Sequence, residues 1–282
     1  DIDDNGFART LNLDEYPGRC YLGIFAPGKS VKTALLRVYA VIMNTVFKAK
    51  IEGVEDEILD PYWTLIGYFN SIRELGGARR LVEDDIPKRL EYLAAETKVK
   101  RKISLCRQIN HFDEITARKK SKEIPDILQK LDLTVGTANV MDVILASNMI
   151  SVGMDIDRLG IMVVNGQQKS TAEYIQAGSR IGRQYPGLVV TVYNWSRPRD
   201  ISHFEKFKAY HQVFYKFVEP TSVTPYSSRA RDRALHAVLV GLCRILFSDL
   251  APSDKAGEIT NYNNEELPLK TILEMIIKRA VE

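Results

Sequence analysis

The sequence has little of the chemistry that marks secreted, metal-binding or membrane proteins. Among its 282 residues there are three cysteines, which lie far apart and form no Cys-x-x-Cys pair: Cys20, Cys106 and Cys243. This pattern argues against a disulfide framework and a zinc site, and the four histidines show no metal-ligand spacing. No apolar run is long enough to cross a bilayer, and no signal peptide is visible. We therefore expect a cytoplasmic protein with no membrane partner and no metal site of its own.

A strong excess of charge is also missing. The formal net charge of +3 is too small to indicate a nucleic-acid partner by itself. Basic residues nevertheless gather between Lys98 and Lys122, where Lys119 and Lys120 are adjacent. Such a cluster can follow a phosphate backbone, but it suits a solvated helix face and a loop equally well. Lys119 and Lys120 are therefore candidate nucleic-acid contacts, with a plain surface role as the alternative.

The length and apolar content fit a globular chain of one large or two small domains. We expect a strand–helix lead-in over residues 1–60, a sheet domain over residues 61–198 and a helical extension over residues 199–282. The chain lacks an initiator methionine and begins with the acidic stretch DIDD. It is therefore expected to be a piece of a longer protein.

Short apolar strands alternate with helical segments in the expected sheet domain. Strands are predicted over residues 142–146, 160–164 and 187–193, with a helix from Thr171 that Ser170 caps. This alternation predicts an α/β fold with a parallel sheet flanked by helices. In such sheets ligands bind at the carboxyl ends of the strands.

The most informative stretch is residues 176–183, QAGSRIGR, in which Arg180 and Arg183 stand three apart. Two residues at this spacing share one face of a helix. A guanidinium is planar, always charged and matched to phosphate oxygens, so the pair could reach one triphosphate. Gly182 between them allows a facing backbone to approach closely. The alternative is a pair of surface arginines at an exposed helix end.

A second stretch, residues 146–156, ASNMISVGMDI, begins where a predicted strand ends. Ser147 and Asn148 offer hydroxyl, amide and backbone groups that can position a nucleic-acid backbone. Gly153 lets the chain turn, and Asp155 can accept hydrogen bonds from a ribose hydroxyl. A helix or turn cap is the alternative role for Asp155.

In this order and spacing, the two stretches resemble motifs V and VI of superfamily 2 helicases, which lie in the second RecA-like domain. The resemblance implies a RecA-like parallel sheet and an ATP-driven motor on nucleic acid. It further implies that Arg183 is an arginine finger, that Arg180 assists at the phosphates and that Gln176 links motif VI to the nucleotide or to motif V. Ser179 departs from the glycine found in many members, but serine is also small.

The same resemblance assigns the second stretch and an earlier strand. It implies that Ser147 and Asn148 face the nucleic-acid backbone, and that Gly153 and Asp155 face the nucleotide. Residues 62–71, YWTLIGYFNS, resemble motif IV, a hydrophobic strand whose polar end faces nucleic acid. This would place Asn70 and Ser71 at the nucleic acid and Arg73 at a phosphate. A plain structural strand followed by a polar turn fits these residues equally well.

Residues 23–30, GIFAPGKS, fit the phosphate-binding P-loop pattern and stand between a predicted strand and a helix over 31–47. In a working P-loop, Lys29 would reach the phosphates and Ser30 would bind Mg²⁺. That chemistry also needs an acidic residue at the end of a buried strand. The predicted strands end instead at uncharged residues, among them Asn70, Asn165 and Asn194. We therefore interpret residues 23–30 as a structural strand–turn–helix.

The implied cofactors are ATP and Mg²⁺, bound in the full-length protein mainly by a first RecA-like domain outside this chain. The implied partners are DNA, with RNA as an alternative, and that first domain. Residues 219–236, with Glu114–Arg118 and Glu123–Pro125, are similar to the large helicases of the DISARM phage-defence system. Two other functions stay open: a non-enzymatic nucleic-acid-binding or docking module, which has no need of Arg183, and a self-contained P-loop domain. The chain by itself is expected to be inactive.

Overall fold

The computed structural model describes residues 16–96, 106–120, 122–147, 156–219, 224, 226–255, 257–258 and 269–281. The chain forms two compact units, one ending at Glu219 and one beginning at Pro220. The first unit thus extends beyond the domain boundary expected near residue 198. Each unit is described by itself.

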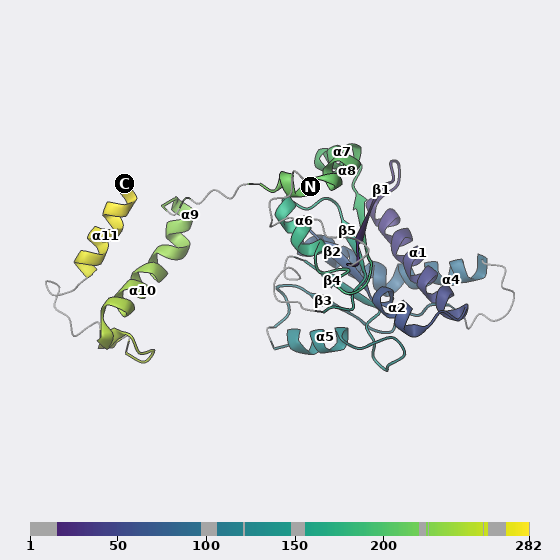
Figure 1. Ribbon diagram of the computed structural model, residues 1–282, viewed down its shortest axis with the longest axis horizontal. Helices are drawn as coiled ribbons and strands as arrows, with labels where there is room; N and C mark the ends of the chain where they lie inside the picture. The colour runs from purple at the N-terminus through teal and green to yellow at the C-terminus, as the bar shows by residue number, and fades with distance from the viewer. Residues whose placement is uncertain are drawn as a thin grey trace. The chain divides into compact units, whose positions relative to one another are not determined.

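A parallel sheet is the centre of the first unit (Figure 1). In the part of the chain that the structure describes, the sheet has six strands in the spatial order β1-β6-β5-β2-β4-β3. The strands are β1 (Arg19–Phe25), β2 (Leu65–Phe69), β3 (Phe112–Ile115), β4 (Val143–Ala146), β5 (Ile161–Asn165) and β6 (Gly187–Tyr193). The central strands β2 and β4 are buried along their whole length, as expected for apolar strands covered on both faces. The predicted parallel α/β sheet is confirmed.

The helices that follow β1 and β2 cover one face of the sheet. They are α1 (Val31–Ile51), α2 (Asp56–Trp63), α3 (Ile72–Arg80), the π-helical turn η1 (Leu81–Asp85) and α4 (Ile86–Glu96). Tyr39, Leu75 and Leu90 of this layer form one buried cluster with alternate residues of the strands, such as Leu145 and Val163. Side chains alternate between the two faces of a strand, so the intervening residues are left to the other face.

The opposite face is covered by α5 (Ile124–Leu131) and α6 (Thr171–Gly178), which Figure 1 shows across the sheet from α1 and α4. Ile127 and Tyr174 pack there against Ile144 and Met162. The helices α7 (Pro198–Glu205) and α8 (Phe207–Gln212) and the turn η3 (Phe214–Phe217) follow β6. Their aromatic side chains pack on rings of β1 and β6, for example Phe204 on Phe25 with ring centroids 4.7 Å apart. These aromatic side chains therefore extend the hydrophobic packing around β1 and β6.

The second unit is helical in its described residues. It contains α9 (Ser228–Ala230), η4 (Arg231–Leu235), α10 (His236–Leu246), η5 (Ser248–Leu250) and α11 (Leu269–Val281). Its buried apolar cluster is small: Cys243, Leu250 and Ile272. None of the helices in the described parts of the chain is long and apolar enough to cross a membrane.

Several local predictions are confirmed, and one is corrected. The Ser170 side chain accepts a hydrogen bond from the Glu173 N–H and caps α6, and β6 has the predicted bounds. Residues 62 and 63, expected to begin a strand, instead end α2. This helix carries Asp56 and Glu57 in its first turn, where carboxylates stabilise the helix dipole, and the following strand begins only at Leu65.

Candidate functional site

The predicted site residues divide between two opposite edges of the sheet. We call the edge where the strands end the carboxyl edge, and the edge where they begin the amino edge. Helix α6 runs back from the carboxyl end of β5 to the start of β6, so the residues after it lie at the amino edge. The predicted nucleic-acid contacts follow strand ends, and the two arginines precede a strand. The structure therefore gathers the candidates into two groups rather than one.

Residues after β2 form the centre of the carboxyl edge. The Asn70 side-chain amide donates to the backbone oxygens of Asn165 (3.3 Å) and Gln167 (3.1 Å), which fixes it against the loop after β5. The Ser71 hydroxyl accepts from the Glu74 N–H and caps α3. Arg73 in the first turn of α3 is exposed. Asn70 and Ser71 thus shape the edge, while the Arg73 guanidinium is open to solvent.

The ends of β4 and β3 continue this edge. Ser147 follows β4 directly and is buried, with its N–H 3.4 Å from the Ile115 oxygen. Lys119 forms an ion pair with Asp113 (2.8 Å) and lies 3.8 Å from a Glu123 oxygen, so its charge is largely neutralised. Lys120 is exposed. Asn148 lies outside the described residues.

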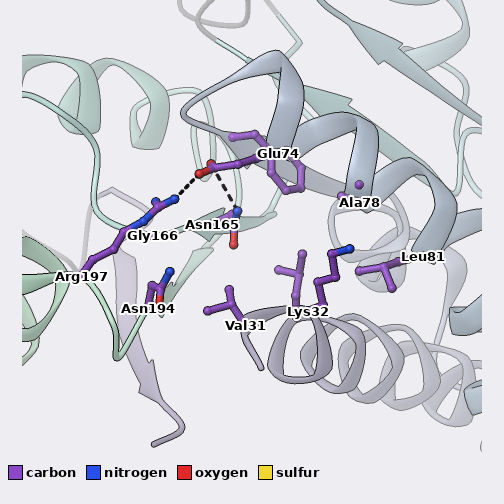
Figure 2. A pocket seen from close by; sticks show the side chains of 12 residues that line it. Val31, Lys32, Glu74, Ala78, Leu81, Asn165, Gly166, Asn194 and Arg197 are labelled. Atoms are coloured by element: carbon purple, nitrogen blue, oxygen red, sulfur yellow. Dashed lines mark hydrogen bonds and ion pairs between the residues drawn. The ribbon is translucent and has the colours of Figure 1, made fainter. Parts of the chain in front are cut away.

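A pocket of about 160 Å³ opens at the carboxyl ends of β2, β5 and β6 (Figure 2). Strands β2 and β5 are neighbours, but α3 after β2 and α6 after β5 cover opposite faces. Such a reversal is where open α/β sheets form ligand crevices. The sequence showed Asn165 and Asn194 as strand ends but gave no sign that they, Glu74 and Lys32 would line one pocket.

Charged and amide groups converge in this pocket. Figure 2 shows the Glu74 carboxylate between the Arg197 guanidinium, which it ion-pairs, and the Asn165 amide, whose Nδ2 lies 3.5 Å from Oε2. The hydrogen bond between the Arg197 guanidinium and the Glu74 carboxylate raises the pKa of Arg197 above its ordinary value. The buried Asp200 carboxylate holds the neighbouring loops, since it accepts from the N–H groups of Gln167 and Asn194.

The amino edge carries the segment of residues 179–186, here called the arginine loop. Helix α6 ends at Gly178, so Arg180 and Arg183 lie in the loop and not on one helix face, which corrects the prediction from their spacing. Gly182, whose φ of +67° is incompatible with a right-handed helix, keeps any helix from continuing to Arg183. The Gly182 N–H donates to the Leu159 oxygen (2.9 Å), and the chain turns here toward β6.

Close backbone packing fixes the arginine loop. A Cβ on Gly182 would lie 2.7 Å from both the N and the Cα of Gly187, the first residue of β6. The expected close approach at Gly182 is therefore confirmed. Arg19 of β1, which sequence reasoning missed, donates to the oxygens of Ile181 (2.5 Å) and Ser179 (3.3 Å). No motif could have identified Arg19, because β1 and the loop are 160 residues apart in the chain.

The two arginines remain partly accessible. Arg183 Nη1 lies 3.3 Å from Asp157 Oδ1, with the two side chains 27% and 51% exposed. Arg180 is half-buried, and Gln176 is exposed on α6. Gly153 and Asp155, the predicted nucleotide contacts of motif V, lie outside the described residues. A phosphate that met Arg183 would compete with an ion pair that is partly solvated and hence weak.

Residues 23–30 form the expected strand, turn and helix. The Lys29 N–H is 3.3 Å from the Ala26 oxygen, and Ser30 caps α1 by accepting from the Thr33 N–H. Gly28 has a φ of +78°, as a tight turn requires. Among the described residues, no group of three or more His, Cys, Asp or Glu side chains is placed to hold a metal ion.

Comparison with known proteins agrees with this architecture. Residues 86–185 match the family model of the helicase conserved C-terminal domain. Over 279 residues, 99% of its length, the chain is 50% identical to the DISARM protein DrmA of Bacillus paralicheniformis, of which it covers 24%. It thus spans about a quarter of that relative's length.

Two solved structures share the fold. Both are of the DUF1998 helicase MrfA, one bound to DNA and one bound to DNA and AMPPNP, and both superpose with a TM-score of 0.52. The identities are 14% and 15%, over 80% and 83% of this chain and 25% and 27% of the MrfA chains. The fold, the family model and the half-identical relative thus agree that this chain is similar to the C-terminal RecA-like domain of superfamily 2 helicases.

Proposed function

We propose that this chain supplies the second half of an ATP-driven motor that moves on nucleic acid. The observation that carries the proposal is that the candidate site residues lie at two opposite edges of the sheet. The arginine loop lies at the amino edge, pinned by Gly182 on β6, and the polar strand ends lie at the carboxyl edge. A nucleotide and a nucleic acid would then bind different edges of one sheet. This separation suits a motor, in which hydrolysis at one place moves a strand at another.

The proposed substrate at the amino edge is ATP. Phosphoryl transfer spreads negative charge over the transferred group, so catalysis consists mainly of positioning and charge stabilisation. Arg183 acts as the arginine finger and Arg180 assists, while Gln176, Gly153 and Asp155 contact the nucleotide. Mg²⁺ would neutralise charge on the phosphates. ATP and Mg²⁺ are held mainly by the first RecA-like domain of the same protein.

The geometry of Arg183 suits a group that waits for a partner. Asp157 forms an ion pair with the planar Arg183 guanidinium. This half-exposed ion pair contributes at most about 1 kcal/mol of stability. Closure of the two RecA-like domains around ATP would exchange Asp157 for phosphate oxygens at little cost. The bound nucleotide thereby couples domain closure to hydrolysis.

The proposed partner at the carboxyl edge is a single strand of DNA, because the structures that share the fold are described as bound to DNA. The contacts to the DNA backbone come from Ser71, Arg73, Ser147, Asn148 and Lys120. Asn70 holds the loop after β5 in place beside them. RNA presents the same phosphates. The half-identical relative is a DISARM protein, so we place the motor in that antiviral defence system.

The test compares three variants of the full-length protein. Arg183→Ala should lower nucleic-acid-stimulated ATP turnover by on the order of 10³-fold. Arg183→Lys should not restore turnover, because it keeps the charge but loses the fork. Asp157→Asn is the matched control: it breaks the same ion pair yet leaves the guanidinium, so turnover should stay near normal. Nucleotide affinity and melting temperature are measured on each variant.

The arginine-finger role predicts lost turnover with nearly unchanged nucleotide affinity and melting temperature. Near-normal turnover in Arg183→Ala would refute that role. A fall in melting temperature large enough to explain the lost turnover would show that Arg183 is structural.

A further inference from the structure

Helix α3 contains two adjacent glycines, Gly76 and Gly77, in its interior. Glycine there destabilises a helix relative to alanine because the unfolded chain gains freedom. Neither position has a packing reason for glycine. A Cβ on Gly77 would meet no neighbouring atom closer than Lys32 Cε at 3.8 Å, and one on Gly76 none closer than Arg118 Nη1 at 4.0 Å. Neither glycine has a positive φ.

The two glycines differ in what lies beside them. Gly77 lines the pocket at the carboxyl edge, whereas Gly76 does not. A larger side chain at position 77 would extend toward Lys32, whose Cε lies 3.8 Å from a Cβ added there and which also lines the pocket. The absence of a side chain at position 77 therefore keeps the space open, which explains a residue that folding alone would disfavour.

The walls of the pocket are mainly apolar. They are formed by Val31, Leu35, Phe69, Ala78 and Leu81. Its volume of about 160 Å³ is below the ~300–1,000 Å³ of pockets that enclose drug-sized ligands. The pocket can therefore hold one flat ring system, but a whole nucleotide would leave its sugar and phosphates outside.

Polar groups at one end of the pocket provide the hydrogen bonds that such a ring would need. Asn165 Oδ1 is buried and has no hydrogen-bond partner among the described residues, a state that proteins usually avoid. The Glu74 carboxylate accepts from Arg197 and Asn165 and retains further acceptor capacity. Lys32 and Arg197 are exposed at the rim, where cations would meet a phosphate.

From these features we infer that the pocket receives one unstacked nucleobase of the bound strand. The inference rests on the proposed function, which runs a strand along the carboxyl edge beside Ser71 and Arg73. Flipped bases are held between apolar side chains and read by hydrogen bonds to their edges, which is the combination of groups found here. The sugar and phosphate remain at the rim, near Lys32.

The experiment measures affinity for single-stranded DNA with the full-length protein. One oligonucleotide is normal, and one of equal length carries abasic sites in place of all central bases. The wild type should bind the normal strand about tenfold more tightly, since stacking one base is worth that much. Gly77→Leu should weaken binding of the normal strand to the abasic level and leave binding of the abasic strand unchanged.

Gly76→Leu is the matched control, because it makes the same change in the same helix outside the pocket. It should keep the preference for the normal strand. Both variants should melt no lower than the wild type, since leucine favours a helix over glycine. Lost preference together with an undiminished melting temperature therefore cannot come from misfolding.

Three results would overturn the inference. If the wild type binds neither strand, the nucleic-acid track fails and the base pocket fails with it. If both strands bind equally well, the track stands and the pocket is not a base site. A free nucleotide offers the same ring, so AMP is titrated as well. AMP binding that Gly77→Leu abolishes, without any preference between strands, would assign the pocket to a free nucleotide instead.

Discussion

Replacement of Gly182 by alanine would test how the arginine loop is held. Gly182 has a φ of +67°, and an added Cβ would lie 2.7 Å from backbone atoms of Gly187. The left-handed conformation costs a residue with a side chain about 1–2 kcal/mol. The overlap is with strand backbone rather than a mobile side chain, and overpacking of this kind costs about 1–3 kcal/mol more. We therefore expect Gly182→Ala to lower the free energy of unfolding by about 2–5 kcal/mol.

A second glycine separates these two contributions. Gly53 has a φ of +91° and no atom within 4 Å of an added Cβ, so Gly53→Ala carries only the conformational cost of about 1–2 kcal/mol. Denaturant titration of both variants gives the difference, and thermal melting should place Gly182→Ala about 4–20 °C below the wild type. If Gly182→Ala were no more costly than Gly53→Ala, the packing of the loop on β6 would not be what holds the arginines.

Two further outcomes are expected. Lys120→Ala should reduce the slope of log affinity for single-stranded DNA against log salt by about one, whereas Lys119→Ala should change it less, because Lys119 is neutralised by Asp113; equal slopes for the two variants would contradict the proposed track. Burial lowers the pKa of His211 below its ordinary 6.5, so the unfolded chain takes up a proton first and the fold loses stability as pH falls through about 6.5. His211→Gln should therefore shrink the drop in melting temperature between about pH 7.5 and pH 5.5, and an unchanged drop in the His211 variant would refute this reasoning.

Local patterns in the sequence were enough to predict that the fold is a parallel sheet flanked by helices. The apolar, β-branched runs predicted at residues 142–146, 160–164 and 187–193 form strands over 143–146, 161–165 and 187–193, as is typical of strands covered on both faces. The N-cap at Ser170 follows from a side chain and a backbone group three residues apart. The resemblance to the family followed from the order and spacing of two stretches, residues 146–156 and 176–183. These features depend on neighbours in the chain, so no tertiary contact is needed to recognise them.

The spacing of the arginines was misleading evidence of their geometry, and their role stays a prediction. Periodicity put Arg180 and Arg183 on one helix face, but the helix ends at Gly178, and the left-handed Gly182 then turns the chain onto β6. The roles of Gly153, Asp155 and Asn148 stay predictions, because these residues lie outside the described part of the chain.

The sequence by itself determined the strands at residues 143–146, 161–165 and 187–193, the Ser170 cap, the resemblance to the family and the candidate arginines, because each is encoded within a few consecutive residues. Only the tertiary structure decided that the arginines and the candidate nucleic-acid contacts lie at opposite edges of the sheet. It alone brought Lys32, Glu74, Asn165 and Arg197 around one pocket. Those residues come from four separate elements and loops, and no local pattern encodes which strand ends become neighbours. That choice follows from the strand order and from which face each helix covers, and both are set by the packing of the whole core.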